Sequence, residues 1–280
     1  MLGALIIVFR EVIEAGLIVG IVLAVTQGLP GSRLVIAAGV LAGAIGASLV
    51  AAFAGAIGEA LAGIGQEIFN ASILLVAVAM LTWHNVWMAS HGRELAADVK
   101  RVGEAVRAGS RSIFALGIVC AVAVMREGSE IALFMYGLVA AGGSTMTELV
   151  IGSLLGLAAG VGVTALTYFG LAAIPQRRLF AVTTLLISLL AAGLAAQAVL
   201  FLQQAGVLTM LSQTAWNTSA ILSDTSLIGR VLHTLIGYSD QPSVLQVVVY
   251  AATLAVIVVL TRTVGSRRAP AVKRRRAAAE

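Results

Sequence analysis

Long apolar stretches separated by short polar ones dominate this chain of 280 residues. About 20 predominantly apolar residues in a row are enough to cross the hydrocarbon of a membrane as a helix. Seven stretches reach that length, at about residues 2–26, 34–55, 68–90, 113–141, 148–173, 179–204 and 244–262. The pattern therefore predicts an all-α integral membrane protein with seven transmembrane helices.

Composition supports this prediction, and charge orients the helices. The chain is 60% hydrophobic and 11% charged, whereas a soluble domain is about 25% charged. Most Lys and Arg residues lie in the segment 27–33, in the loop 91–112, at Arg177–Arg178 and in the tail 262–276. Basic loops stay on the cytoplasmic side, so the N-terminus is predicted outside and the C-terminus in the cytoplasm. The net charge of +5 comes from these loops and the tail, and we expect no nucleic-acid partner.

Two of the apolar stretches contain charged residues in their interior. The first carries Arg10, Glu11 and Glu14, and the fourth repeats the spacing with Arg126, Glu127 and Glu130. Each such charge costs about 2.5–3.5 kcal/mol on insertion scales, so intramembrane charges usually mark a function. Residues three and four apart share one helical face, and each motif therefore presents its charges together.

The spacing of the two motifs predicts an inverted repeat. They are three helices apart, and an odd number of spans reverses the direction of the second copy, as in many transporters. Repeat one covers about residues 1–90 and repeat two about 113–204, leaving the outer loop 205–243 and the last helix 244–262 outside the repeat. Glycines in the second and fifth helices favour close helix packing. We expect one permease domain over residues 1–264 and a basic cytoplasmic tail over 265–280, lying against membrane lipid.

If the inverted copies face each other, their charges converge near the middle of the membrane. The expected metal ligands are Glu11, Glu14, Glu127 and Glu130, with Arg10 and Arg126 supporting them. Clustered carboxylates repel one another and share protons when no cation is bound. Their oxygens are hard ligands suited to hard cations. The alternative is that each motif is a buried ion pair that only fixes helix packing.

The motifs resemble those of the oxidase-dependent iron permeases, the family of the fungal high-affinity iron permease and the bacterial EfeU-type transporters. The resemblance covers nearly the whole chain and includes Phe9–Val25, Trp83–His91, Gly237-Tyr238, Pro242 and Tyr250. It implies that the four motif glutamates bind and pass Fe3+. The first motif has Val12 where the family often has Gly, whereas Gly128 keeps the glycine in the second.

Three further residues are candidates for the ion pathway. His84 is a candidate relay or ligand, although it also fits an interfacial position beside Trp83. Gln197 lies deep in the sixth helix and could offer a neutral oxygen to the path. Glu67 opens the third helix on the outer side, where it could attract cations or be simply solvated.

These observations favour an iron permease over an enzyme. The resemblance implies import of ferric iron across the bacterial inner (plasma) membrane, with iron as the transported substrate and no resident cofactor. It also implies an outer-surface ferroxidase or iron-binding protein as partner, and a homo-oligomer remains possible. Another divalent cation, Pb2+ or Mn2+, is the alternative substrate, because carboxylates alone do not discriminate. An intramembrane metalloprotease would need a motif such as His-Glu-x-x-His, which the sequence lacks.

Overall fold

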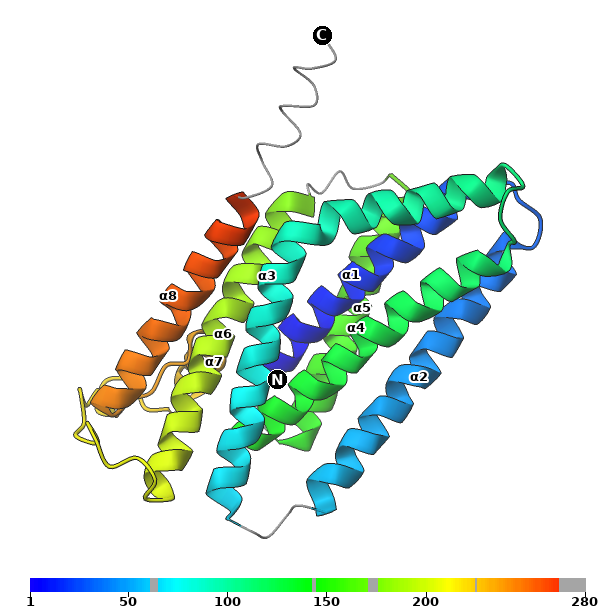
Figure 1. Cartoon of the computed structure of the whole chain (residues 1–280). Coiled ribbons are helices and arrows are strands. Elements are labelled where there is room, and N and C mark those ends of the chain that lie inside the picture. The colour runs from blue at the N-terminus through cyan, green and yellow to red at the C-terminus, as the bar shows by residue number, and fades with distance from the viewer. Residues whose placement is uncertain (61–64, 143–144, 171–175, 225, 267–280) are drawn as a thin grey trace. The chain divides into compact units, whose positions relative to one another are not determined.

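The computed structural model describes residues 1–60, 65–142, 145–170, 176–224 and 226–266 (Figure 1). The predicted all-α fold is confirmed. The helices are α1 (Leu2–Val25), α2 (Ser32–Ala60), α3 (Gln66–Arg107), α4 (Phe114–Ala141), α5 (Met146–Tyr168), α6 (Gln176–Gln204), α7 (Leu227–Ile236) and α8 (Val244–Ser266). Most of the predicted basic tail, residues 267–280, lies outside the described residues.

The described helices include five that are long and apolar enough to cross a membrane, which confirms an integral membrane protein. These are the segments Ser32–Ala56, Gln66–Met88, Met146–Tyr168, Phe180–Gln204 and Val244–Val264. Helices α1 and α4 have 24 and 28 residues, or roughly 36 and 42 Å at 1.5 Å per residue. They are long enough to span but each carries three charged residues near its middle.

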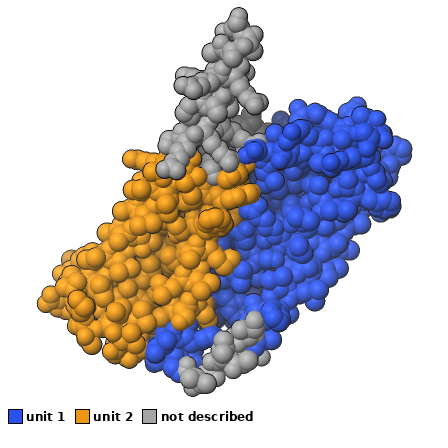
Figure 2. All heavy atoms as spheres, in the orientation of Figure 1, with its two compact units in different colours: residues 1–69, 94–183 blue, residues 70–93, 184–280 orange. Residues whose placement is uncertain are grey.

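The chain forms two compact units (Figure 2). The first contains Met1–Phe69 and Glu94–Thr183, and the second contains Asn70–Arg93 and Thr184–Glu280. Helices α3 and α6 therefore contribute residues to both. The charged motifs of α1 and α4 belong to the first unit.

Within the first unit, α1 packs against α5 and α2 packs against α4 through glycines. A Cβ on Gly156 of α5 would lie 2.6 Å from the carbonyl oxygen of Leu5 in α1, and one on Gly43 of α2 would lie 2.5 Å from that of Ala121 in α4. No side-chain carbon fits at such distances. Glycine is therefore what lets these backbones approach.

The two helix pairs share one register relative to the charged motifs. In each pair, glycines lie against carbonyl groups nine and five residues before the motif arginine. The contacts are Gly39 with Gly117, Gly43 with Ala121, Gly152 with Met1, and Gly156 with Leu5. The helix that carries each motif is thus held by its neighbour at equivalent positions.

Beside each motif, a glycine of one helix faces a side chain of the other. In one pair the side chain belongs to the motif helix, and in the other it belongs to the neighbouring helix. A Cβ on Gly160 of α5 would lie 2.8 Å from Cγ1 of Val12 in α1. In the other pair the glycine is on the motif helix, because a Cβ on Gly128 of α4 would lie 2.6 Å from Cβ of Ala47 in α2. Val12 in place of glycine therefore leaves the close packing intact, since Gly160 supplies the space.

Helix α3 continues beyond its apolar span as far as Arg107, where the charged pattern alone predicts a separate surface helix within 91–112. Its last turns belong to the first unit, and their apolar residues are buried there. Val99 and Val106 join a core with Ile18 and Val22 of α1 and Leu116 of α4. This stretch is amphipathic because it packs against protein on one side.

In the second unit, the described residues of the predicted outer loop 205–243 form a hydrogen-bonded segment, called the cap below. Its backbone is tied together by bonds from the Ala215 N–H to the Pro242 carbonyl, at 2.8 Å, and from the Thr218 N–H to the Asp240 carbonyl, at 2.9 Å. Helix α7 follows Ser226, whose side-chain oxygen accepts a hydrogen bond from the Gly229 N–H at the start of the helix. It ends before Gly237, whose φ of 69° is left-handed, a conformation that favours glycine. The cap and helices α6 and α8 line a cavity of about 230 Å³.

Candidate cation site in the first unit

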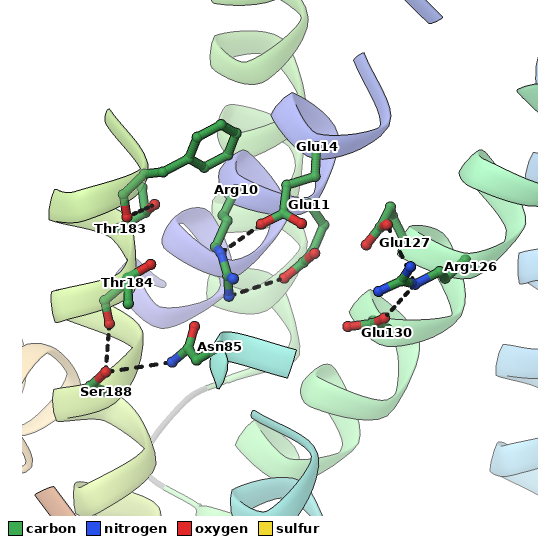
Figure 3. Close-up of polar contacts among 11 residues, drawn as sticks. Arg10, Glu11, Glu14, Asn85, Arg126, Glu127, Glu130, Thr183, Thr184 and Ser188 are labelled. Atoms are coloured by element: carbon green, nitrogen blue, oxygen red, sulfur yellow. Dashed lines mark hydrogen bonds and ion pairs between the residues drawn. The ribbon is translucent and has the colours of Figure 1, made fainter. Parts of the chain in front are cut away.

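The first charged motif is buried in the middle of α1. The side chains of Arg10, Glu11 and Glu14 are 1%, 0% and 2% exposed. Nε of Arg10 lies 2.9 Å from Oε1 of Glu14, and its Nη1 lies 3.8 Å from Oε1 of Glu11 (Figure 3). One guanidinium therefore neutralises part of the charge of two buried carboxylates on the same helical face.

The second motif, on α4, repeats this pattern but is less enclosed. Nε of Arg126 lies 3.3 Å from Oε1 of Glu130 and 3.7 Å from Oε1 of Glu127. Glu127 is 3% exposed, whereas Glu130 is 16% and Arg126 is 34% exposed. The two motifs thus share their internal ion pairs and differ in how far the arginine is covered.

The carboxylates of the two helices meet. One oxygen from each of Glu11, Glu127 and Glu130 can be chosen so that all lie within 4.8 Å of one another. Three carboxylate oxygens at this separation, buried or partly buried, could bind a multivalent cation between them with small movements. Glu14 lies one helical turn after Arg10 on α1 and forms an ion pair with it.

Three further residues predicted for the ion pathway lie on α3 and α6. Glu67 is exposed in the first turn of α3. His84 is 3% exposed, on the part of α3 that belongs to the second unit. Gln197 of α6 lines the cavity of the second unit, together with residues of the cap such as Trp216, His233 and Tyr238.

Two buried polar residues of the second unit were not identified from the sequence. Asn85 of α3 is 1% exposed and Ser188 of α6 is 6% exposed, and the amide nitrogen of Asn85 lies 3.5 Å from Oγ of Ser188. The available signal was an Asn inside an apolar span, next to His84. A Ser in α6 is unremarkable, because serine readily bonds to its own helix backbone.

Apolar spanning helices together with a buried cluster of charges are typical of membrane transport proteins. The fold and the site thus define a multi-pass membrane permease. Residues 1–266 match the Iron permease FTR1 family, and the chain belongs to that family. The predicted resemblance is confirmed, and so is the prediction of a transporter in place of an enzyme.

Bacterial relatives with curated names are similar over much of the chain. The ferrous iron permease EfeU of Shigella flexneri is 33% identical over 186 residues, which are 66% of this chain and 78% of that protein. The ferrous iron permease EfeU of Shigella sonnei (strain Ss046) is 33% identical over 186 residues, covering 66% of this chain and 67% of that protein. No solved structure matches the chain.

Proposed function

We propose that this protein imports iron across the bacterial plasma membrane through the carboxylates of its two Arg-Glu-x-x-Glu motifs. The observation that carries the proposal is the approach of Glu11 on α1 to Glu127 and Glu130 on α4, with oxygens within 4.8 Å. Membership of the iron permease family identifies iron as the substrate. Glu14 completes the ligand set in the proposal, as the partner of Arg10.

Charge explains why a cation would occupy this site. The four glutamates and two arginines of the motifs carry a formal charge of −2 when all are ionised. Burial penalises unpaired charge, and carboxylates this close repel one another. A multivalent cation relieves both costs. The arginines keep the residual charge small enough for the ion to leave again, which conduction requires.

We further propose seven spans arranged as an inverted repeat of α1–α3 and α4–α6, with α8 added outside it. Helices α1 and α4 supply the two spans that contain three charges. The matched register of the α1–α5 and α4–α2 contacts supports this arrangement. With the basic loops inside, the N-terminus lies outside and the tail 265–280 lies on the cytoplasmic surface.

The ion that binds the carboxylates is proposed to be Fe3+. The carboxylate oxygens of the two motifs favour the harder ion. Because Fe3+ is scarcely soluble, an outer-surface ferroxidase or iron-binding protein would supply it. The second candidate is Fe2+, which is favoured by the names of the relatives, both ferrous iron permeases.

Iron uptake by cells that express single variants tests the proposal. We expect Glu14→Gln and Glu130→Gln to reduce radioactive iron uptake to the level of cells without the protein. The matched control is Glu104→Gln, because this glutamate of α3 is exposed and was not assigned to the pathway; its uptake should stay near that of the wild type. Uptake with and without a ferrous chelator distinguishes Fe2+ from Fe3+, and competition by Mn2+ or Pb2+ tests selectivity. Normal uptake by both motif variants would refute the carboxylate pathway.

A further inference from the structure

Among the described residues, the interior of the second unit contains one side-chain amide, that of Asn85, whose buried oxygen makes no hydrogen bond. Its buried polar residues are His84, Asn85, Ser188, Ser243 and Gln246, and none of them is acidic, Lys or Arg, among the residues that the structure describes. Ser243 and Gln246 satisfy each other at the start of α8, because each backbone N–H donates to the other's side-chain oxygen. The Gln246 amide also donates to the Ala196 carbonyl.

Asn85 is different, because the orientation of its side-chain amide leaves the buried oxygen without a hydrogen bond to any described residue. The Ser188 hydroxyl donates to the Thr184 carbonyl at 2.7 Å, so its oxygen can only accept from Asn85. The NH2 group must therefore be the part of the amide that faces Ser188. The Oδ1 atom then points away from Ser188 (Figure 3), and it has no hydrogen-bond partner among the described residues.

A carbonyl oxygen in this state is costly unless something binds it. Leaving a buried acceptor unpaired costs about 1–3 kcal/mol. Neutral carbonyl oxygens are hard ligands that replace the hydration shell of a cation, and they bind it more weakly than carboxylates do. Such a ligand suits a step at which the ion must also be released.

We propose that Asn85 Oδ1 is a neutral oxygen ligand for the transported metal cation, and that Ser188 is a positioning residue that holds its amide. This inference rests on the proposed function, since it assumes that a hard cation passes through the protein. It assigns one neutral ligand to α3 in the second unit, besides the anionic ligands that α1 and α4 carry in the first unit.

The test is iron influx into vesicles containing the wild type, Asn85→Leu, Asn85→Asp or Ser188→Ala, normalised to the amount of folded protein. Loss of a ligand oxygen predicts about a tenfold lower influx for Asn85→Leu. Asn85→Asp keeps the oxygen and adds charge, so it should lower both the half-saturating iron concentration and the maximal rate. Ser188→Ala should lie between the wild type and Asn85→Leu.

The control for Ser188→Ala is Thr253→Ala in α8, which removes a similar bond from a hydroxyl to its own helix, here to the Val249 carbonyl. It should leave influx unchanged. Wild-type kinetics for folded Asn85→Leu would overturn the inference. If that variant does not fold, unchanged half-saturation and rate for Asn85→Asp would overturn it equally. Failure of the proposed function looks different, because the wild type itself would then move no more iron than Glu14→Gln.

Discussion

At the residue scale, the two arginines of the motifs make the same ion pairs in different surroundings. Arg10 is 1% exposed, whereas Arg126 is 34% exposed. Removing one partner of a fully buried ion pair leaves an uncompensated charge and costs about 3–5 kcal/mol. An exposed pair contributes about 0–1 kcal/mol. The arginine of α1 should therefore matter more for stability than its counterpart on α4.

We predict that Arg10→Met lowers the thermal unfolding midpoint of the detergent-solubilised protein much more than Arg126→Met. Neutralising a carboxylate as well, in Arg10→Met with Glu14→Gln, should recover part of the loss because one fewer buried charge is left unpaired. Gel filtration checks that each variant is monodisperse. Equal shifts for the two single variants would show that burial does not distinguish the arginines.

Another residue-scale effect lies in the cap of the second unit, where two aspartates hold each other's backbone. The Asp240 N–H donates to Oδ1 of Asp224 at 3.0 Å, and the Asp224 N–H donates to Oδ2 of Asp240 at 3.2 Å. Burial, followed by the charge of Asp240, raises the pKa of Asp224 above its ordinary value, although the Asp240 backbone bond opposes this. The folded state thus binds this proton more tightly than the unfolded chain does.

The sign of the resulting pH dependence follows from linkage. The contribution of Asp224 to stability is complete below the ordinary aspartate pKa of about 4 and is lost as the pH rises through the raised value. We predict that Asp224→Asn, which keeps the oxygen acceptor, loses less stability than the wild type between about pH 4 and pH 7. Unfolding midpoints across this range measure the effect, with the exposed Asp98→Asn as control. A steeper loss in Asp224→Asn would contradict the assigned direction.

At the element scale, glycines set how closely α5 and α2 hold the helices that carry the motifs. Val12 faces Gly160 in one pair, and Ala47 faces Gly128 in the other. Each pair therefore combines one side chain with one glycine, on opposite helices. The total volume at the contact, more than the identity of either residue, determines how near the backbones come.

This complementarity predicts a rescue. Gly160→Ala places a Cβ 2.8 Å from Val12 Cγ1 and should reduce both folded protein and iron uptake. Adding Val12→Gly recreates the arrangement of Gly128 and Ala47 and should restore most of both. The control is Gly162→Ala in the same helix, where a Cβ meets nothing within 4 Å. Independent, additive losses in the double variant would argue against a shared contact.

Much of the element pattern could be predicted from the sequence. The apolar stretches give α1 and α4 to within a residue or two, because long uncharged runs have few alternatives in a membrane. The continuation of α3 to Arg107 could not, because charged periodicity does not reveal which partner covers Val99 and Val106. The Asn85–Ser188 pair was also missed, since it depends on which faces of α3 and α6 meet. The meeting of Glu11 with Glu127 followed from symmetry, but the role of the cluster is still a proposal.

At the scale of the whole molecule, the proposed inverted repeat requires a fixed orientation in the membrane. The connection between α3 and α4 should lie in the cytoplasm and the cap before α8 should lie outside. The single native cysteine, Cys120, is buried. It can be replaced without disturbing an exposed reporter.

We predict that, in Cys120→Ala protein, Ser110→Cys and Gln241→Cys label from opposite sides of the membrane. Both positions are exposed. An impermeant maleimide should modify Gln241→Cys in intact spheroplasts and Ser110→Cys only in inverted vesicles. Labelling of both positions from one side would contradict the predicted topology, in which the three spans α4, α5 and α6 separate them.

The most direct test of the central claim is iron influx into proteoliposomes that contain only the purified protein and an enclosed iron-sensitive dye. The account predicts influx with the wild type and loss with either Glu11→Gln or Glu127→Gln, because both helices contribute to one ligand cluster. Each variant should still be folded, as judged by gel filtration. Influx at the wild-type rate in folded Glu11→Gln and Glu127→Gln protein would contradict the claim that iron passes through the paired motifs.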